Sequence, residues 1–267
     1  MRRAATHDDL TVWLEREAPR QPNDTIIVER LSLAVRTRHG RGRRELDNRR
    51  DLGLLVDEST GPEEQGVAAA ALGLGPDARY RVVVAPLFAV WDEHPSGPED
   101  VVPTAFGPLH ALVLPGQMST VGATPCGIGV AAGIGGLHHS FRTAVVALRL
   151  CDLPATGQVS ADEFGGLASL LADSHGTTPQ PDVEHLAEVL GHPWGPTTVD
   201  AIVRSGSVRQ AARAAGVHHS TMRTRVDTLT EALGFDPLDG FGRTRLGTAH
   251  LVWRLRTSRV LDLPPPV

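Results

Sequence analysis

Residues 206–226 constrain the chain more than any other stretch, because a small-residue run, a glycine and a second amphipathic run follow without a gap. Ser207 is a favoured N-cap for the first of two predicted helices. The small-residue face of this helix consists of Ala211, Ala212 and Ala215. Gly216 stands where the helix should end. The pattern predicts two short helices joined by a tight turn, with Val217 pointing inward.

The second helix can be capped by His218 or Ser220. Its apolar stripe has helical spacing and consists of Met222, Val226, Leu229 and Leu233. The polar and basic side chains near its start that lie off this stripe are His219, Thr221, Arg223, Thr224 and Arg225. Side chains placed in this way can reach DNA phosphates and base edges. The alternative is an ordinary amphipathic hairpin with solvated arginines.

Charge is divided unevenly along the chain. The 267 residues have a net charge of −5. Residues 196–260 hold ten arginines and five acidic residues, so a basic C-terminal module follows an acidic body. This division suits nucleic-acid binding by one part of the chain.

Targeting and redox signals are weak. The two cysteines, Cys126 and Cys151, lie in no metal-type motif and predict free buried thiols in a reducing compartment. Neither an N-terminal apolar region nor an 18-residue apolar run occurs in the sequence. We therefore expect a soluble cytoplasmic protein, located with the nucleoid if it binds DNA.

The body of the chain alternates predicted helices and strands. Helices are expected at residues 7–20, 25–36, 46–56, 63–72 and 137–150, and a strand followed by a helix at 159–172. Strands are expected at residues 80–88, 110–115 and 126–131, the second after a hairpin turn at 106–108. Residues 36–50 contain seven arginines. This stretch is either a solvated turn between helices or a supplementary contact to DNA phosphates.

These elements predict an α+β fold, with an α/β-type body before a small all-α helix-turn-helix domain. The C-terminal domain adds helices at residues 197–204 and 241–259 to the hairpin. The expected divisions are an N-terminal helical segment at 1–44, a body at 45–173, a linker at 174–195 and the helix-turn-helix domain at 196–260.

Residues 198–234 resemble the C-terminal helix-turn-helix of PucR/CdaR-type bacterial transcriptional regulators, which is similar to the Fis DNA-binding hairpin. The matching positions are Val217, His218, Thr221, Arg225, Val226, Leu233 and Gly234. His219 and Ser220 replace a common Arg-Asn pair, and Thr224 replaces an aromatic residue. These departures bear on which DNA sequence is read.

Upstream, residues 51–57, 69–74 and 81–84 look like the degenerate GGDEF-like domain that precedes this module in the family. Later stretches at 127–130, 140–144 and 159–165 continue that resemblance. It implies a regulatory or dimerisation domain for the body. The GGDEF ancestor holds metal ions with carboxylates at a hairpin turn, and the equivalent residues 106–110 contain no carboxylate, so cyclase chemistry is not expected.

Two further sequence motifs favour structural roles over ligand binding. The glycines of residues 127–136 could admit a dinucleotide phosphate, but Ala132 stands at the third glycine position, which favours a strand-to-helix loop. The adjacent pairs 138–139 and 218–219 place neighbouring histidines about 100° apart on a helix, so neither pair should grip a metal. The sequence predicts no catalytic residue, metal or cofactor.

The resulting hypothesis is a sequence-specific DNA-binding transcriptional regulator that acts as a homodimer, with an unknown small-molecule or protein effector and no membrane association. The expected DNA-binding residues are Ser207, Arg209, Gln210, His218, His219, Ser220, Thr221, Arg223, Thr224 and Arg225. Two alternatives stay open: a protein-binding regulator with a vestigial helix-turn-helix, and a nucleotide-sensing, non-catalytic GGDEF-like protein.

Overall fold

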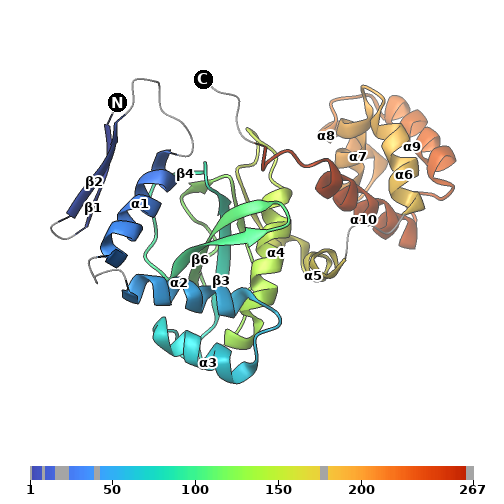
Figure 1. Cartoon of the computed structure of the whole chain (residues 1–267). Coiled ribbons are helices and arrows are strands. Elements are labelled where there is room, and N and C mark those ends of the chain that lie inside the picture. Colours follow the sequence, from blue (N-terminus) through green and yellow to red (C-terminus); the bar gives the residue numbers. More distant parts are fainter. Residues whose placement is uncertain (1, 8–9, 16–23, 39–42, 175–179, 263–267) are drawn as a thin grey trace. The chain divides into compact units, whose positions relative to one another are not determined.

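The computed structural model describes residues 2–7, 10–15, 24–38, 43–174 and 180–262. The chain divides into two compact units (Figure 1). The sheet unit comprises Met1–Asp173 and Arg259–Val267, and the helical unit comprises Ser174–Ser258. Among the described residues, no helix combines the length and the apolar character needed to cross a bilayer.

The sheet unit begins with a hairpin of β1 (Arg2–His7) and β2 (Leu10–Glu15), followed by helix α1 (Asp24–Arg38). The prediction of a helix at residues 7–20, and of a wholly helical N-terminal segment, is therefore wrong. Leu10, Val12 and Leu14 alternate along β2, and this period of two favours a strand. The helix predicted at residues 25–36 is confirmed as α1.

Five strands form the central sheet, in the order β5-β6-β3-β8-β9. All neighbours are antiparallel except β8 and β9, which run parallel. A separate two-stranded ladder pairs β4 with β7. The strands are β3 (Tyr80–Pro86), β4 (Val90–Trp91), β5 (Glu99–Thr104), β6 (Gly107–Pro115), β7 (Ala123–Thr124), β8 (Cys126–Ile128) and β9 (Gln158–Ser160). The strands predicted at 80–88, 110–115 and 126–131 are confirmed as β3, β6 and β8, and the strand predicted at the start of 159–172 is confirmed as β9. Strands β5, β4 and β7 were not predicted.

Helices of this unit pack beside the sheet (Figure 1). The helices that follow α1 are α2 (Arg43–Val56), α3 (Pro62–Ala71), η1 (Ile134–Gly136), α4 (Leu137–Arg149), η2 (Ala161–Phe164) and α5 (Gly166–Asp173). Of these, α3 packs on α2 and η1, and α5 packs on α4 and η2. α4 contacts β3 and β8, and α2 contacts α3, α4 and β5. Of the arginine-rich stretch at 36–50, residues 39–42 lie outside the described residues, and the helix resumes at Arg43.

Two glycines let α4 approach β8 closely. A Cβ atom at Gly127 would lie 2.1 Å from the Ala144 carbonyl oxygen and 2.2 Å from the Leu148 nitrogen. A Cβ at Gly129 would lie 2.0 Å from the Ser140 carbonyl oxygen. Real Cβ atoms do not come so near to backbone, so these positions need glycine. Helix packing thus accounts for the glycines at 127 and 129.

The opposite face of the sheet carries a buried cluster of Val83, Ala85, Leu112, Leu114, Ala123, Cys126 and Ile128. Trp91 of β4 and Met118 of the connection between β6 and β7 pack against this cluster. Both cysteines are buried and free, as predicted, and the Cys151 thiol donates to the Cys126 carbonyl oxygen at 3.3 Å. Burial raises the pKa of Cys126 to about 12, which keeps it protonated.

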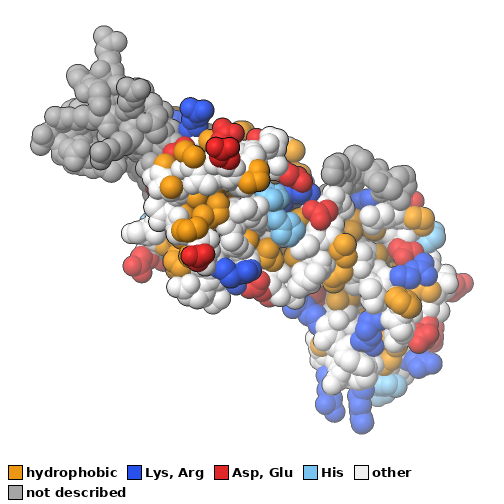
Figure 2. Space-filling model, turned by 90° about the horizontal axis from the view of Figure 1, so that it is seen from below, with side chains coloured by type: hydrophobic (Ala, Val, Ile, Leu, Met, Phe, Trp, Pro, Cys, Tyr) orange, Lys and Arg blue, Asp and Glu red, His pale blue; other side chains and the backbone are white. Residues whose placement is uncertain are grey.

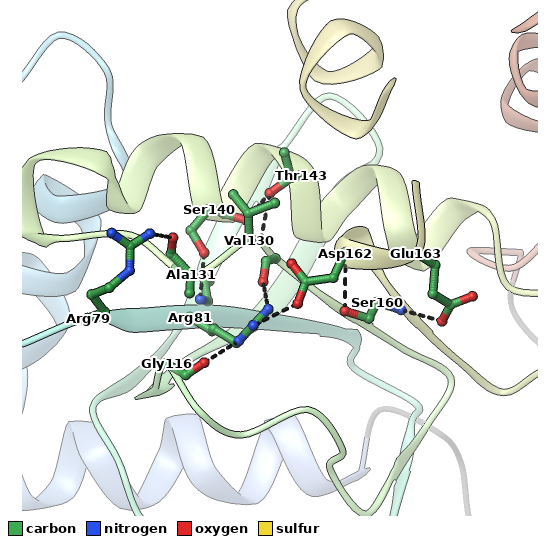
Figure 3. Close-up of polar contacts among 12 residues, drawn as sticks. Arg79, Arg81, Gly116, Val130, Ala131, Ser140, Thr143, Ser160, Asp162 and Glu163 are labelled. Carbon is green, nitrogen blue, oxygen red and sulfur yellow. Dashed lines mark hydrogen bonds and ion pairs between the residues drawn. The ribbon is translucent and has the colours of Figure 1, made fainter. Parts of the chain in front are cut away.

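Arg81 of β3 ties several segments of the sheet unit together (Figure 3). Its guanidinium donates to the carbonyl oxygens of Gly116 at 2.6 Å and Gly129 at 2.9 Å. It also pairs with the Asp162 carboxylate at 2.7 Å. Next to it, the Val82 amide donates to the Ser140 hydroxyl of α4 at 2.9 Å. The Arg81 side chain is only 11% exposed, and its hydrogen bonds and ion pair stabilise the sheet unit.

The helical unit consists of α6 (Pro181–Leu190), α7 (Gly195–Val203), α8 (Val208–Ala214), α9 (His219–Leu233) and α10 (Gly240–Thr257). The linker predicted at residues 174–195 is wrong for 181–190, because this segment is helix α6, which packs against α9 and α10. Its buried residues are Val183, Leu186, Val189 and Leu190. They recur at helical spacing, so α6 is part of the core of this unit.

Candidate DNA-binding surface

The hairpin of α8 and α9 has caps and a turn that its sequence explains. The Ser207 hydroxyl accepts from the Gln210 amide, and the Gln210 side-chain oxygen accepts from the Gly206 amide at 3.0 Å. These bonds satisfy backbone donors that a helix start leaves unpaired. Gly216 has a φ of +65°, which suits the left-handed turn after α8.

α9 is fixed by its apolar stripe. Met222 and Leu229 are fully buried, and Val226 and Leu233 are nearly so, as the spacing predicted. α8 supplies Ala211 and Ala212, which are also buried and let the two helices approach. Burial of this face determines which side chains of α9 remain accessible.

The predicted contact residues divide into three groups in the structure. The first group is exposed: Arg209 on α8, and His219, Thr221, Arg223 and Thr224 on the first turns of α9. Arginine side chains project from this unit in Figure 2. Arg223 pairs with Asp227 at 3.6 Å, and both side chains are about two-thirds exposed, at 65% and 66%. Such a solvated ion pair contributes little, so Arg223 can exchange this partner for another.

The second group serves the helix starts. Ser207 and Gln210 cap α8. His218 caps α9: its Nδ1 accepts from the Ser220 amide and lies 2.7 Å from the Ser220 hydroxyl. Of the two predicted caps of α9, His218 takes the role. These four side chains are exposed, and each has a polar atom in one of these local hydrogen bonds.

Arg225 forms the third group and departs from the prediction. It is half-buried against α7, where its guanidinium donates to the Thr198 hydroxyl at 2.9 Å. The guanidinium carbon also lies 5.4 Å from the centre of the Trp194 ring. His192 stacks on the Trp194 ring, with 5.2 Å between the ring centres. Arg225 therefore holds α9 against α7, whereas the sequence suggested that it projects toward DNA.

One exposed arginine was missed by the sequence reasoning. Arg213 lies on α8, four residues after Arg209. Residues four apart on a helix are neighbours on one face, so the two guanidinium groups can act together. The spacing of Arg209 and Arg213 is visible in the sequence, so Arg213 could have been predicted from it.

The other motifs have structural explanations in the sheet unit. The hairpin turn predicted at residues 106–108 lies at residues 104–107, between β5 and β6. His139 Nε2 lies 3.0 Å from the Ser169 hydroxyl, so this histidine has a hydrogen-bond partner within the sheet unit.

A shallow depression of about 580 Å³ is lined by residues that include Arg79, Tyr80 and Gln117.

Comparisons with known proteins identify one segment of the helical unit. No curated protein matches the chain. A solved structure of a regulator of polyketide synthase expression from Bifidobacterium adolescentis is similar over 79% of this chain and 99% of that chain, with 18% identity and a TM-score of 0.35. Residues 197–252 match the family model of the PucR C-terminal helix-turn-helix domain. Residues 197–252 therefore form a PucR-type C-terminal helix-turn-helix domain.

Proposed function

We propose that this protein is a sequence-specific DNA-binding transcriptional regulator that reads DNA with α9. The observation that carries the proposal is the exposed set Arg209, Arg213, His219, Thr221, Arg223 and Thr224. These side chains are held on two helices whose opposite faces are buried, inside a segment that matches a helix-turn-helix family. A rigid helix start that presents polar and basic groups is what major-groove reading requires.

Different residues take different roles in this proposal. Arg223 meets a base edge, with guanine as the favoured partner of an arginine fork. His219, Thr221 and Thr224 line the groove beside it. Arg209 and Arg213 bind phosphates and set the register, together with the start of α8 at Ser207 and Gln210 and the α9 cap at His218 and Ser220. Arg225 acts as a positioning residue, because it fixes α9 on α7.

We further propose that two copies act together on two half-sites, with the sheet unit as a non-catalytic, GGDEF-like regulatory part. One module of this size reads few bases and binds weakly, which favours a dimer. The mixed sheet covered by helices offers a body that can dimerise or receive an effector. The turn at residues 104–107 has no carboxylate for Mg²⁺, which supports a regulatory rather than a catalytic body.

The test is a mobility-shift titration with an operator selected from random DNA by the unaltered protein. Arg209→Ala and Arg213→Ala should each weaken binding to all sequences and lower the slope of log affinity against log salt by about 0.9. Arg223→Ala should relax preference at one base pair, by ~1–3 kcal/mol.

Arg259→Ala is the matched control, because Arg259 is also exposed and pairs with Asp262 at 3.5 Å, outside the matched segment. It should bind like the unaltered protein. Absence of binding at low salt, or binding that does not respond to salt, would instead favour the protein-binding regulator with a vestigial hairpin.

A further inference from the structure

We propose that His94, Glu99 and His110 of the sheet unit form a binding site for a divalent transition-metal ion of the Zn²⁺ class. This site is independent of the DNA-binding surface. It comes from three segments of the chain: the connection between β4 and β5, strand β5, and strand β6.

The strand register brings two of the ligands to one face. Val101 of β5 pairs with His110 of β6. Glu99 precedes Val101 by two residues, and side chains two apart point to the same side of a strand. Glu99 and His110 are thus diagonal neighbours across the two strands, within reach of each other.

The connection that carries His94 is held firmly against the sheet. The Val113 amide of β6 donates to the Pro98 carbonyl oxygen at 2.9 Å. Gly97 packs so closely on β6 that a Cβ atom there would lie 2.6 Å from the Val113 carbonyl oxygen. At the other end, the Asp92 amide donates to the Gly122 carbonyl oxygen at 2.7 Å. His94 is therefore presented from a short, anchored segment, as a preformed metal site requires.

The three donor atoms converge on one point. His94 Nε2 lies 3.1 Å and His110 Nε2 lies 2.8 Å from the same carboxylate oxygen, Oε2 of Glu99. All three ligand atoms lie within 4.8 Å of one another. Zinc bonds to histidine nitrogen and carboxylate oxygen are about 2.0–2.2 Å long. Small side-chain rotations are enough to admit an ion between them.

The hydrogen-bonding chemistry of His94 itself points to a cation. Its Nδ1 lies 3.1 Å from the Pro95 carbonyl oxygen, and the tautomer with a proton on Nδ1 donates to that oxygen. Its Nε2 faces an ionised carboxylate, which also only accepts. A neutral imidazole would then turn a lone pair toward the carboxylate. A metal ion between Nε2 and Oε2 satisfies both atoms, and a backbone carbonyl on the second nitrogen is the usual support of a ligating histidine.

Trp91 gives the site an apolar wall and a reporter. Its ring centre lies 4.6 Å from that of His94 and 5.5 Å from that of His110. The two imidazoles stack on each other at 5.6 Å. Trp91 also packs against the buried cluster of the sheet, so the wall is fixed by the core. His110 is 18% exposed, while His94 and Glu99 are nearly half exposed, which leaves the site open to water.

Two imidazoles and one carboxylate favour Zn²⁺, Co²⁺ or Ni²⁺ over Mg²⁺ or Ca²⁺, which prefer oxygen ligands. Three protein ligands leave at least one position for water. Bound metal would clamp the connection between β4 and β5 onto strands β5 and β6.

The test uses the full chain, freed of metal by a chelator and titrated with Zn²⁺ in a calorimeter. One equivalent should bind. His94→Ala and His110→Ala should each weaken that binding by at least tenfold, and Glu99→Gln should weaken it less. His185→Ala, which removes an exposed histidine of α6, is the matched control and should bind like the unaltered protein.

Co²⁺ provides a second readout at the site. It should quench part of the tryptophan fluorescence of the unaltered protein, and this part should vanish in Trp91→Phe and in His94→Ala. Circular dichroism confirms that each variant is folded. No stoichiometric binding to the unaltered protein, or equal binding by all folded variants, would overturn the proposal.

Discussion

Arg225→Ala should destabilise the packing of α9 on α7 without removing a DNA contact. The variant loses a hydrogen bond from a charged donor to Thr198. Hydrogen bonds of charged groups contribute about 1.5 kcal/mol at the low end of their range, and this value suits a half-buried group. It also loses the contact with Trp194, worth about 0.5 kcal/mol. We therefore expect a loss of about 2 kcal/mol.

Hydrogen exchange measured on peptides of the full chain is the suitable assay, because it reports local opening in a protein of two units. A loss of 2 kcal/mol corresponds to about 30-fold faster exchange in peptides from α7 and α9. Peptides of the sheet unit serve as an internal control and should not change. Thr198→Val keeps the shape of the partner, and a double-mutant cycle with Arg225→Ala should give a coupling of about 1 kcal/mol or more.

DNA binding distinguishes the two arginines. At temperatures where the helical unit stays folded, Arg225→Ala should leave the sequence preference unchanged, whereas Arg223→Ala should alter it. The reasoning is refuted if Arg225→Ala leaves exchange in α7 and α9 unaltered and relaxes preference as strongly as Arg223→Ala does.

Three further predictions concern stability. Gly127→Ala should destabilise the sheet unit by about 3 kcal/mol or more in thermal unfolding, because its Cβ would overlap α4 backbone; Gly133→Ala, with open space around it, should be nearly neutral. Burial, followed by the charge of Arg254, lowers the pKa of His250 to about 4. The unfolded chain then binds the proton first, so the helical unit should keep its stability above pH 6.5 and lose roughly 3 kcal/mol as the pH falls toward 4; His250→Leu should flatten this dependence in unfolding followed against pH. Gly216→Ala should cost about 1 kcal/mol in the same unfolding assay, because only the left-handed backbone opposes it; a change near zero would contradict that reading of the turn.

The helical hairpin could be predicted from its sequence because local signals agree there. Caps, a glycine turn and a regular apolar stripe all indicate the same two helices, and the structure has them. The role of Arg225 could not be predicted in this way. With about 100° per residue, Arg223 and Arg225 flank the buried stripe on opposite sides. Only the position of α7 decides which of them is covered.

Other misses have identifiable causes. β5 contains Pro103 and begins with two acidic residues, which disfavour a strand, yet β5 lies at the edge of the sheet, where proline is tolerated. α6 carried a proline at its start and regular apolar spacing, so its signal was present and was overlooked among the prolines around it. The site at His94 depends on strand register, which spacing along the chain does not reveal.

The glycines at 127 and 129 have a consequence for how such chains vary during evolution. Substitution there is opposed by backbone atoms of α4 rather than by a ligand. Relatives that share this contact should therefore retain both glycines whether or not they bind any nucleotide. Such a pair of glycines, at a strand end before a helix, then reflects selection for a short distance between helix and sheet. A search for phosphate-binding proteins that relies on such pairs would also return proteins in which the glycines serve only this packing.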